Sequence, residues 1–204
     1  MLGTATIQAS DEALVAQYVD NGDERAIRTL VERHQERLYG YLVGMVRDRN
    51  VADDLFQETF LRVLSALRSE RASYNDQGRF LGWAMRIARN AALDHLRQRK
   101  KWQDVDAGAE EDSASFWEQI KDDAPAADQT MQETVIRDTL RECIDRLPPE
   151  QREVVLLRHE AELTFREIAD LTGVSINTAL GRMRYALINL RKAMQSPLTD
   201  FSAS

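Results

Sequence analysis

The chain has 204 residues, of which 43% are hydrophobic, and a formal net charge of −7 at pH 7. This length suits one large or two small domains, and the composition is ample for packed cores, which excludes a disordered protein. The acidic balance excludes a uniformly basic nucleic-acid coat, so contact with nucleic acid would be confined to local basic patches and another charged partner is expected.

Cysteine, histidine and apolar patterns exclude several kinds of site. Cys143 is the single cysteine, so neither an intrachain disulfide nor a cysteine-based zinc cluster can form. His34, His95 and His159 lack metal-ligand spacing and are interpreted as surface or packing residues. No apolar run approaches the roughly 18 residues of a membrane span, and the N-terminus does not resemble a signal peptide. We expect a cytoplasmic chain with no metal, no cofactor and no direct membrane insertion.

A helical repeat of apolar residues fills the first half of the chain, from residue 11 to residue 101. Apolar side chains recur there at the spacing of one helix face, which predicts helices that share a core. We expect these helices at residues 11–19, 24–46, 51–67 and 79–101. No strand pattern competes with this all-α interpretation.

The third of these helices has a polar side opposite its apolar side. Leu55, Phe60 and Val63 face the predicted core. The opposite side consists of polar residues, namely Asp53, Asp54, Gln57, Glu58 and Arg62. Taken alone, such a side is typical of a helix face in contact with water.

The fourth helix is strongly basic. Phe80 and Trp83 belong to its apolar stripe, and we assign Trp83 to the core. Asp94 opposes a group of cations, namely Arg86, Arg89, Arg97, Arg99, Lys100 and Lys101. A basic helix beside an aromatic-bearing loop, here 73–78, suits single-stranded nucleic acid, which needs cations for its phosphates and a surface on which unstacked bases can rest.

Residues 102–133 are acidic and show little periodicity. The acids there are Asp104, Asp106, Glu110, Glu111, Asp112, Glu118, Asp122, Asp123, Asp128 and Glu133, against the single cation Lys121. This composition is typical of a solvated, flexible tether.

Residues 134–196 are helical again and contain the most informative local pattern of the chain. Two short helical patterns are joined by Gly173, which allows a tight turn, and Ser175 is suited to cap the second helix. Every charged residue from Val174 to Gln195 is basic. The pattern predicts a helix-turn-helix whose second helix enters the DNA major groove, although a plain helical hairpin would show a similar turn.

Several motifs follow one another along the chain at characteristic separations. They are Asp54-Leu55-Phe56-Gln57-Glu58-Thr59-Phe60, Trp83-Ala84-Met85-Arg86-Ile87-Ala88-Arg89-Asn90, Asp94-His95-Leu96-Arg97, Leu147-Pro148 and Glu167-Ile168-Ala169. Together they resemble the sigma factors of bacterial RNA polymerase, and most closely the compact extracytoplasmic-function (ECF) group, which keeps only regions 2 and 4. The resemblance implies an all-α fold of two small helical domains joined by a flexible acidic linker. Region 2 would occupy residues 11–101, the linker 102–133, and region 4, with the helix-turn-helix, 134–196.

The resemblance also implies an initiation subunit without catalytic residues, so an enzyme has little support. Its partners would be core RNA polymerase, at the β′ clamp helices and the β flap, promoter DNA and an anti-sigma factor. The residues that match the polymerase-docking helix are Asp54, Gln57 and Glu58.

Two groups of residues match DNA-binding positions of the family. Those that match the minus-ten surface are Ser73, Tyr74, Asn75, Arg86, Arg89, Asn90, Arg97, Arg99, Lys100 and Lys101. In the loop among them, capture of a flipped base would offset the cost of unstacking it. Those that match the minus-thirty-five surface are Ser175, Asn177, Thr178, Leu180, Gly181, Arg182, Arg184 and Tyr185. Leu180-Gly181 stands where many family members carry a basic residue followed by serine, which leaves the number of base-edge hydrogen bonds open.

The main alternative is a stand-alone helix-turn-helix regulator whose N-terminal domain senses a ligand or dimerises. Such a regulator would bind a duplex site without polymerase and would have no use for the Asp54, Gln57 and Glu58 face. For a sigma factor, we expect the acidic tether to let the free domains fold together, with its acids competing for the DNA-binding arginines until polymerase holds the domains apart.

Overall fold

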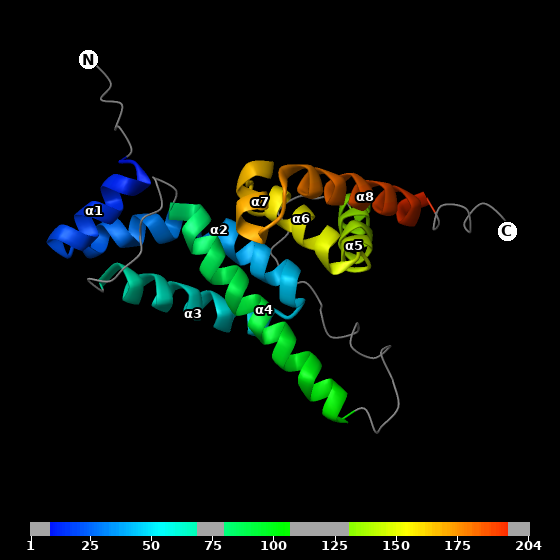
Figure 1. Ribbon diagram of the computed structural model, residues 1–204, viewed down its shortest axis with the longest axis horizontal. Coiled ribbons are helices and arrows are strands. Elements are labelled where there is room, and N and C mark those ends of the chain that lie inside the picture. Colours follow the sequence, from blue (N-terminus) through cyan, green and yellow to red (C-terminus); the bar gives the residue numbers. More distant parts are fainter. Residues whose placement is uncertain (1–8, 69–79, 107–130, 196–204) are drawn as a thin grey trace, which may run out of the picture.

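The computed structural model describes residues 9–68, 80–106 and 131–195 (Figure 1). All regular elements within these ranges are α-helices, which confirms the all-α expectation. They are α1 (Asp11–Asn21), α2 (Glu24–Val46), α3 (Arg49–Arg68), α4 (Phe80–Asp106), α5 (Met131–Asp145), α6 (Pro149–His159), α7 (Phe165–Thr172) and α8 (Ile176–Gln195). Ser73, Tyr74 and Asn75, and the linker from 107 to 130, lie outside the described residues.

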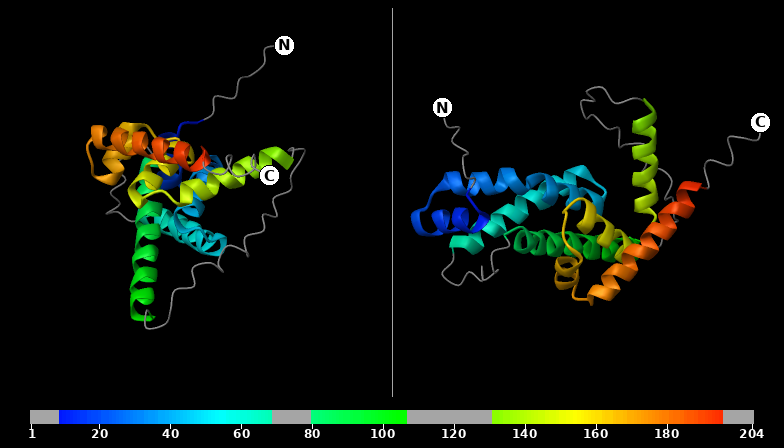
Figure 2. Two further views of the ribbon diagram at one scale, coloured as in Figure 1. Left: turned by 90° about the vertical axis from the view of Figure 1, so that its right-hand side faces the viewer. Right: turned by 90° about the horizontal axis from the view of Figure 1, so that it is seen from above.

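The ends of several helices differ from the sequence-based expectation. Helix α4 continues to Asp106, beyond residue 101, and α5 begins at Met131. Because neither proline nor glycine occurs between residues 101 and 106, nothing in the chain interrupts the hydrogen-bond ladder of α4 there. The C-terminal half of α4 extends away from the other helices (Figures 1 and 2).

Helices α1 to α4 pack around one part of the apolar core. Leu30, Leu38, Tyr41 and Phe80 are fully buried there. His34 is a buried packing residue, because its Nε2 lies 2.7 Å from Asp11 Oδ2 and its ring centroid lies 5.6 Å from that of Phe80. Burial lowers the pKa of His34 below its usual value, although Asp11 acts in the opposite direction.

Helices α5 to α8 form a second group. Cys143, Leu147 and Val155 make a small apolar cluster with Ala186 and Leu190 of α8. The sulfur-bearing Cys143 is therefore a core residue of this group.

The two groups of helices lie against each other. Helix α6 contacts α2, and α7 contacts α4 (Figures 1 and 2). One cluster of buried apolar residues continues from Leu38 and Met45 of the first group into Val154, Leu157 and Ile168 of the second. The two helical domains therefore share a core in this arrangement.

Helix α7 begins with a reciprocal cap. The Thr164 hydroxyl accepts a hydrogen bond from the Glu167 backbone N–H at 3.3 Å, and the Glu167 carboxylate accepts one from the Thr164 N–H at 2.7 Å. These bonds satisfy two backbone donors that a helix start leaves unpaired. The cap fixes where α7 begins, and therefore where the turn to α8 lies.

Thr164→Ala should lower the free energy of unfolding by about 1 kcal/mol, because it removes the hydroxyl that caps α7. Thr164→Ser keeps the hydroxyl and should retain most of the stability. Urea unfolding followed by circular dichroism measures both. An equal loss in the serine variant would show that the threonine methyl group, and not the cap, stabilises this helix.

Candidate nucleic-acid interface

The turn between α7 and α8 has the geometry that the sequence predicts. Gly173 ends α7 in the left-handed region with φ 71°, which glycine adopts without a steric penalty. Ser175 precedes α8, and its hydroxyl accepts a hydrogen bond from the Thr178 N–H at 3.0 Å and lies 2.8 Å from the Thr178 hydroxyl. These two hydroxyl groups therefore hold the start of α8.

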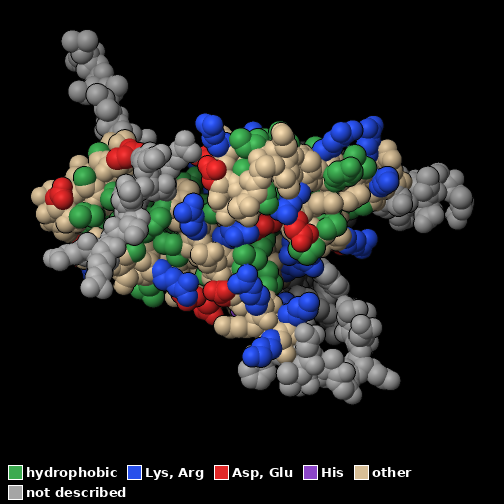
Figure 3. Space-filling view, in the orientation of Figure 1, with side chains coloured by type: hydrophobic (Ala, Val, Ile, Leu, Met, Phe, Trp, Pro, Cys, Tyr) green, Lys and Arg blue, Asp and Glu red, His purple; other side chains and the backbone are tan. Residues whose placement is uncertain are grey.

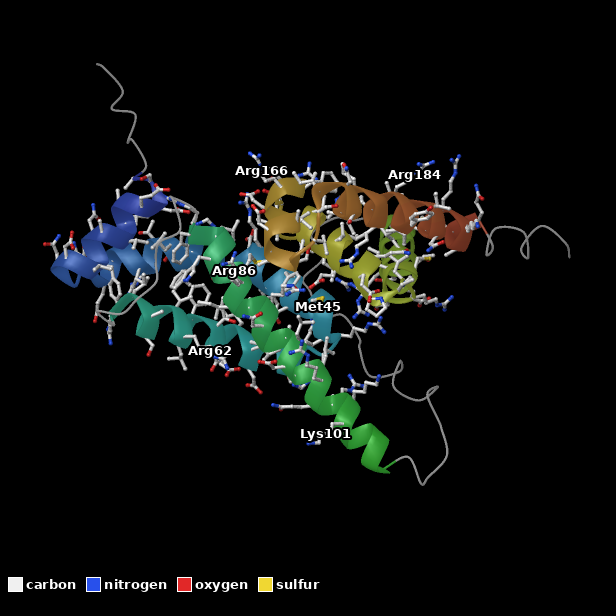
Figure 4. All side chains as sticks on the ribbon, in the orientation of Figure 1. Met45, Arg62, Arg86, Lys101, Arg166 and Arg184 are labelled. Carbon is white, nitrogen blue, oxygen red and sulfur yellow. The ribbon has the colours of Figure 1, made fainter. Side chains whose placement is uncertain are left out.

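One side of α8 is buried and the opposite side is open. Ala179, Ala186 and Leu190 face the core. The candidate minus-thirty-five residues that are exposed are Ser175, Asn177, Thr178, Leu180, Arg184 and Tyr185, while Gly181 and Arg182 are half-buried. Arg184 lies on the outer edge of the molecule, away from α2 to α4 (Figure 4). A duplex could therefore approach α8 from that side without meeting the first group of helices.

Ile176, the first residue of α8, is exposed although it is apolar, and it is not among the residues that the sequence predicts for this surface. Its side chain is 41% exposed, and Leu180, one turn later, is 43% exposed. The period of apolar residues assigns an isoleucine at the start of a helix to the core. The one signal for exposure is that Ile176 lies one turn before Leu180, on the open side of α8. The helix thus presents an apolar pair at its N-terminal end, with Arg184 on the following turn.

Helix α3 presents a separate face, opposite its buried side. Asp54 and Gln57 are exposed, and Glu58 is half-buried and forms an ion pair with Arg62 at 2.6 Å. Leu61, at 66% exposure, lies on the same side. Acidic side chains gather along this edge, near the position of Arg62 in the stick view (Figures 3 and 4). The face combines negative charge with one large apolar side chain.

The basic residues of α4 are open to solvent, with one exception. Arg86, Asn90, Arg97, Arg99, Lys100 and Lys101 are exposed. Arg97 pairs with Asp94 at 3.1 Å, but both side chains remain mostly exposed, so the arginine stays accessible. Lys101 lies toward the projecting end of α4 (Figure 4). Trp83 is half-buried and packs against the core.

Arg89 is the exception. Its Nε donates to Glu153 Oε1 of α6 at 2.8 Å, and a second hydrogen bond of 3.4 Å joins Nη2 to Oε2. The side chains of Arg89 and Glu153 are 19% and 9% exposed. Arg89 thus faces the second group of helices in this arrangement, whereas the other candidate minus-ten residues of α4 face solvent.

Two kinds of site are absent from the described ranges. They hold no group of three or more histidine, cysteine or acidic side chains placed to bind a metal ion. None of the described helices combines the length and the apolar composition that a membrane span needs. The candidate binding surfaces are therefore the basic face of α4, the outer face of α8 and the acidic face of α3.

Comparisons with known proteins identify the family of the chain. Residues 30–102 match the family model Sigma-70 region 2, and residues 137–185 match Sigma-70, region 4. RNA polymerase sigma factor CarQ of Myxococcus xanthus is 34% identical over 175 residues, which are 85% of this chain and 92% of the relative. ECF RNA polymerase sigma factor SigW of Bacillus subtilis is 25% identical over 178 residues, 87% and 93% of the two chains. The sigma factor RpoE of Bartonella quintana, solved in complex with the anti-sigma factor NepR, has a TM-score of 0.66 at 17% identity and covers 84% of this chain and 98% of its own.

Proposed function

Because the chain belongs to the ECF sigma factors of bacterial RNA polymerase, we propose that its three exposed surfaces divide the work of promoter recognition. The protein binds core RNA polymerase and promoter DNA, directs transcription initiation and is not an enzyme. Control by an anti-sigma factor is supported by the neighbour solved with one. A stand-alone regulator is disfavoured by the region 2 match over residues 30–102. Since its polymerase works in the cytoplasm, we place the protein there.

The acidic face of α3 is the proposed docking surface for polymerase. Asp54, Gln57 and Glu58 would meet the β′ clamp helices, and Leu61, one turn after Gln57 and Glu58, would supply an apolar contact. Charges arranged in this way speed encounter with a basic partner and set its orientation, while a desolvated apolar side chain holds the complex. The observation that carries this proposal is that Asp54, Gln57 and Leu61 are exposed, and Glu58 partly exposed, on one side of α3. Leu55 and Val63 are buried on the other side.

Asp54→Lys combined with Glu58→Lys should abolish binding to core polymerase, because the substitutions bring like charges together. The fold should survive, since neither side chain is buried. The matched control is Glu32→Lys with Glu36→Lys, which makes the same change in charge at the same spacing on exposed positions of α2. Native-gel binding to core enzyme measures the effect. Retained binding by the α3 variant, or equal loss in the α2 variant, would remove the docking assignment.

The DNA-reading surfaces are assigned to two different helices. The exposed residues of α4 (Arg86, Asn90, Arg97, Arg99, Lys100 and Lys101), and Arg89 once it is free, would hold the minus-ten element. The outer face of α8 would read the minus-thirty-five element in the major groove. Basic side chains occur over both α4 and α8 (Figure 3), so phosphate contacts are available on each, although the protein as a whole is acidic.

Substitutions on the two helices should have different effects in promoter binding by the holoenzyme. Arg184→Ala and Tyr185→Ala should each change which upstream bases are tolerated, at a cost of about 1–3 kcal/mol for a base contact. Arg97→Ala and Lys100→Ala should weaken binding on all sequences and reduce the salt slope by about one. Titrations at several salt concentrations on a set of promoter variants separate the two results. If Arg184→Ala weakens binding equally on every upstream sequence, Arg184 contacts phosphate.

Ile176 and Leu180 give the upstream surface an apolar part. The 5-methyl group of thymine is the apolar feature on the base edges of the major groove, and apolar side chains in contact with it discriminate thymine from the other bases. Leu180 stands where many relatives place a basic side chain, so an apolar contact would replace a hydrogen bond at this position. Gly181 leaves open space beside Leu180, since a Cβ there would meet nothing within 4 Å.

Replacing the thymines of the preferred minus-thirty-five element by deoxyuridine should weaken binding of this DNA by the holoenzyme, because the replacement removes only the 5-methyl group. Loss of one methyl contact costs about 0.8 kcal/mol, or roughly fourfold in Kd. Leu180→Ala should bind both DNAs alike, whereas the control Leu187→Ala, which alters an exposed leucine farther along α8, should keep the difference. A deoxyuridine effect that persists unchanged in Leu180→Ala would assign the methyl contact to another residue.

A further inference from the structure

The contact between the two groups of helices depends on bare backbone in α2. A Cβ at Gly44 would lie 2.4 Å from Leu156 Cδ2 and 2.9 Å from Cδ1, and a Cβ at Gly40 would lie 2.7 Å from Glu160 Oε2. Gly40 and Gly44 are one helical turn apart, so they lie on the same side of α2. Helix α6 can approach α2 this closely because Gly44 carries no side chain, whereas at Gly40 only the flexible end of Glu160 would have to move.

Charged groups buried around this contact hold it in one register. Arg89 and Glu153 form their ion pair across it, and Arg152 of α6 donates to the Met45 carbonyl of α2 at 3.4 Å. The Tyr41 side chain is fully buried, and burial, reinforced by the nearby Glu153 carboxylate, raises the pKa of its hydroxyl. A buried charge that loses its partner is strongly unfavourable, so these groups favour one specific arrangement over a sliding contact.

Two unusual backbone conformations occur at the same boundary. Among the described residues, Arg47 and Glu162 are the non-glycine residues with positive φ, at 61° and 55°. Arg47 Nε lies 3.1 Å from Asp145 Oδ1, and Glu162 pairs with Arg37. Each of these ion pairs joins the first group of helices to the second. Such conformations persist where the surrounding structure imposes them, and they concentrate at switch regions.

This arrangement is incompatible with simultaneous contact to both promoter elements. Their names place them about 25 base pairs apart, which at about 3.4 Å per base pair is about 85 Å of duplex. The two DNA-binding surfaces lie on one packed body whose longest helix, α4 with 27 residues, is about 40 Å long, which is less than half of that length of duplex. In this arrangement Arg89, a proposed minus-ten residue, is also occupied by its ion pair with Glu153. The exposed residues of α3, in contrast, remain accessible in the closed arrangement.

We propose that the packing of α6 against Gly40 and Gly44, joined by the Arg89–Glu153 ion pair, is an intrinsic autoinhibitory contact: the free protein closes on itself without a second protein and must open to use a promoter. The proposal rests on the function proposed for Arg89 and α8. The sequence-based expectation is that the acidic tether lets the domains fold together. In this proposal the folded helices of both regions make the contact instead. The proposal also predicts that the closed protein still binds polymerase, because closure leaves Asp54 and Gln57 exposed.

A disulfide can trap the closed form. A Cβ on Gly40 would lie 3.5 Å from the Glu160 Cβ, within the range of about 3.5–4.5 Å that disulfides require. Gly40→Cys with Glu160→Cys also removes the carboxylate that a side chain at position 40 would meet. The full-length free protein, treated with oxidised glutathione, should form this intramolecular bond in high yield, as measured by gel mobility and mass spectrometry. The two single-cysteine variants control for reaction of Cys143.

The oxidised protein should bind core polymerase like wild type and fail to hold both promoter elements. Loss of one of two linked contacts lowers promoter binding by the holoenzyme roughly 100-fold or more, and dithiothreitol should restore it. Absence of the crosslink in free protein would overturn closure, and full promoter binding by the oxidised protein would overturn autoinhibition. The crosslink yield is measured on the free protein without DNA, so it tests closure alone. Failure of the proposed function would be seen in a different measurement, as a wild-type holoenzyme that recognises no promoter.

Opening the contact gives the converse test. Gly44→Ala places a methyl group against the buried Leu156, whereas Gly40→Ala meets the flexible end of Glu160 and is the matched control. Both substitutions favour helix formation in α2, so region 2 should stay folded. Gly44→Ala alone should raise the radius of gyration in small-angle scattering and strengthen promoter binding by the free protein. Equal scattering and promoter binding in wild type and both variants would overturn the proposal.

Discussion

Leu156 occupies the space that a side chain at Gly44 would fill, and the position of region 4 on region 2 depends on this contact. Once α6 lies at that depth, Glu153 reaches Arg89 and Arg152 reaches the carbonyl of Met45. The same approach continues one apolar cluster across the boundary, because Val154 and Leu157 enter the core that Leu38 and Met45 begin. A bulkier residue at position 44 would therefore affect charge pairing and core packing together.

The interactions across the contact favour specificity more than strength. Desolvation of Arg89 and Glu153 offsets much of their mutual attraction, so a buried ion pair of this kind adds little net stability while strongly penalising other registers. Such a contact can be reversed by a partner of ordinary affinity. Binding that prefers the open form by about 5.5 kcal/mol converts a population that is 99% closed into one that is 99% open. Promoter DNA, which only the open form can hold at both elements, is the ligand that supplies such a preference.

Local patterns predicted much of the fold, and long-range contacts account for what they missed. The bounds of α2 and the turn at Gly173 follow from apolar period, capping residues and glycine, all of which act within a few positions. The partner of Arg89 is 64 residues away, and no periodicity relates an arginine to a glutamate at that distance. Ile176 was missed for a related reason, since an apolar residue at a helix start is ordinarily buried. The acidic composition after residue 101 concealed the continuation of α4, because charge does not by itself end a helix.

The ribosome synthesises the chain from its N-terminus, so α2 and α4 are made before α6, which contacts them in the closed arrangement. Region 2 emerges with Gly44 and Arg89 before Glu153 has been synthesised, because Arg89 and Glu153 are 64 positions apart in the chain. At roughly 5–20 residues per second this interval lasts roughly 3–13 seconds. During it, a nascent region 2 has no α6 packed against Gly44, and Arg89 has no Glu153 to pair with. A newly made molecule therefore passes through an unclosed form during its synthesis, and a ligand of Arg89 or of the Gly44 side of α2 that meets it then encounters no intramolecular competitor.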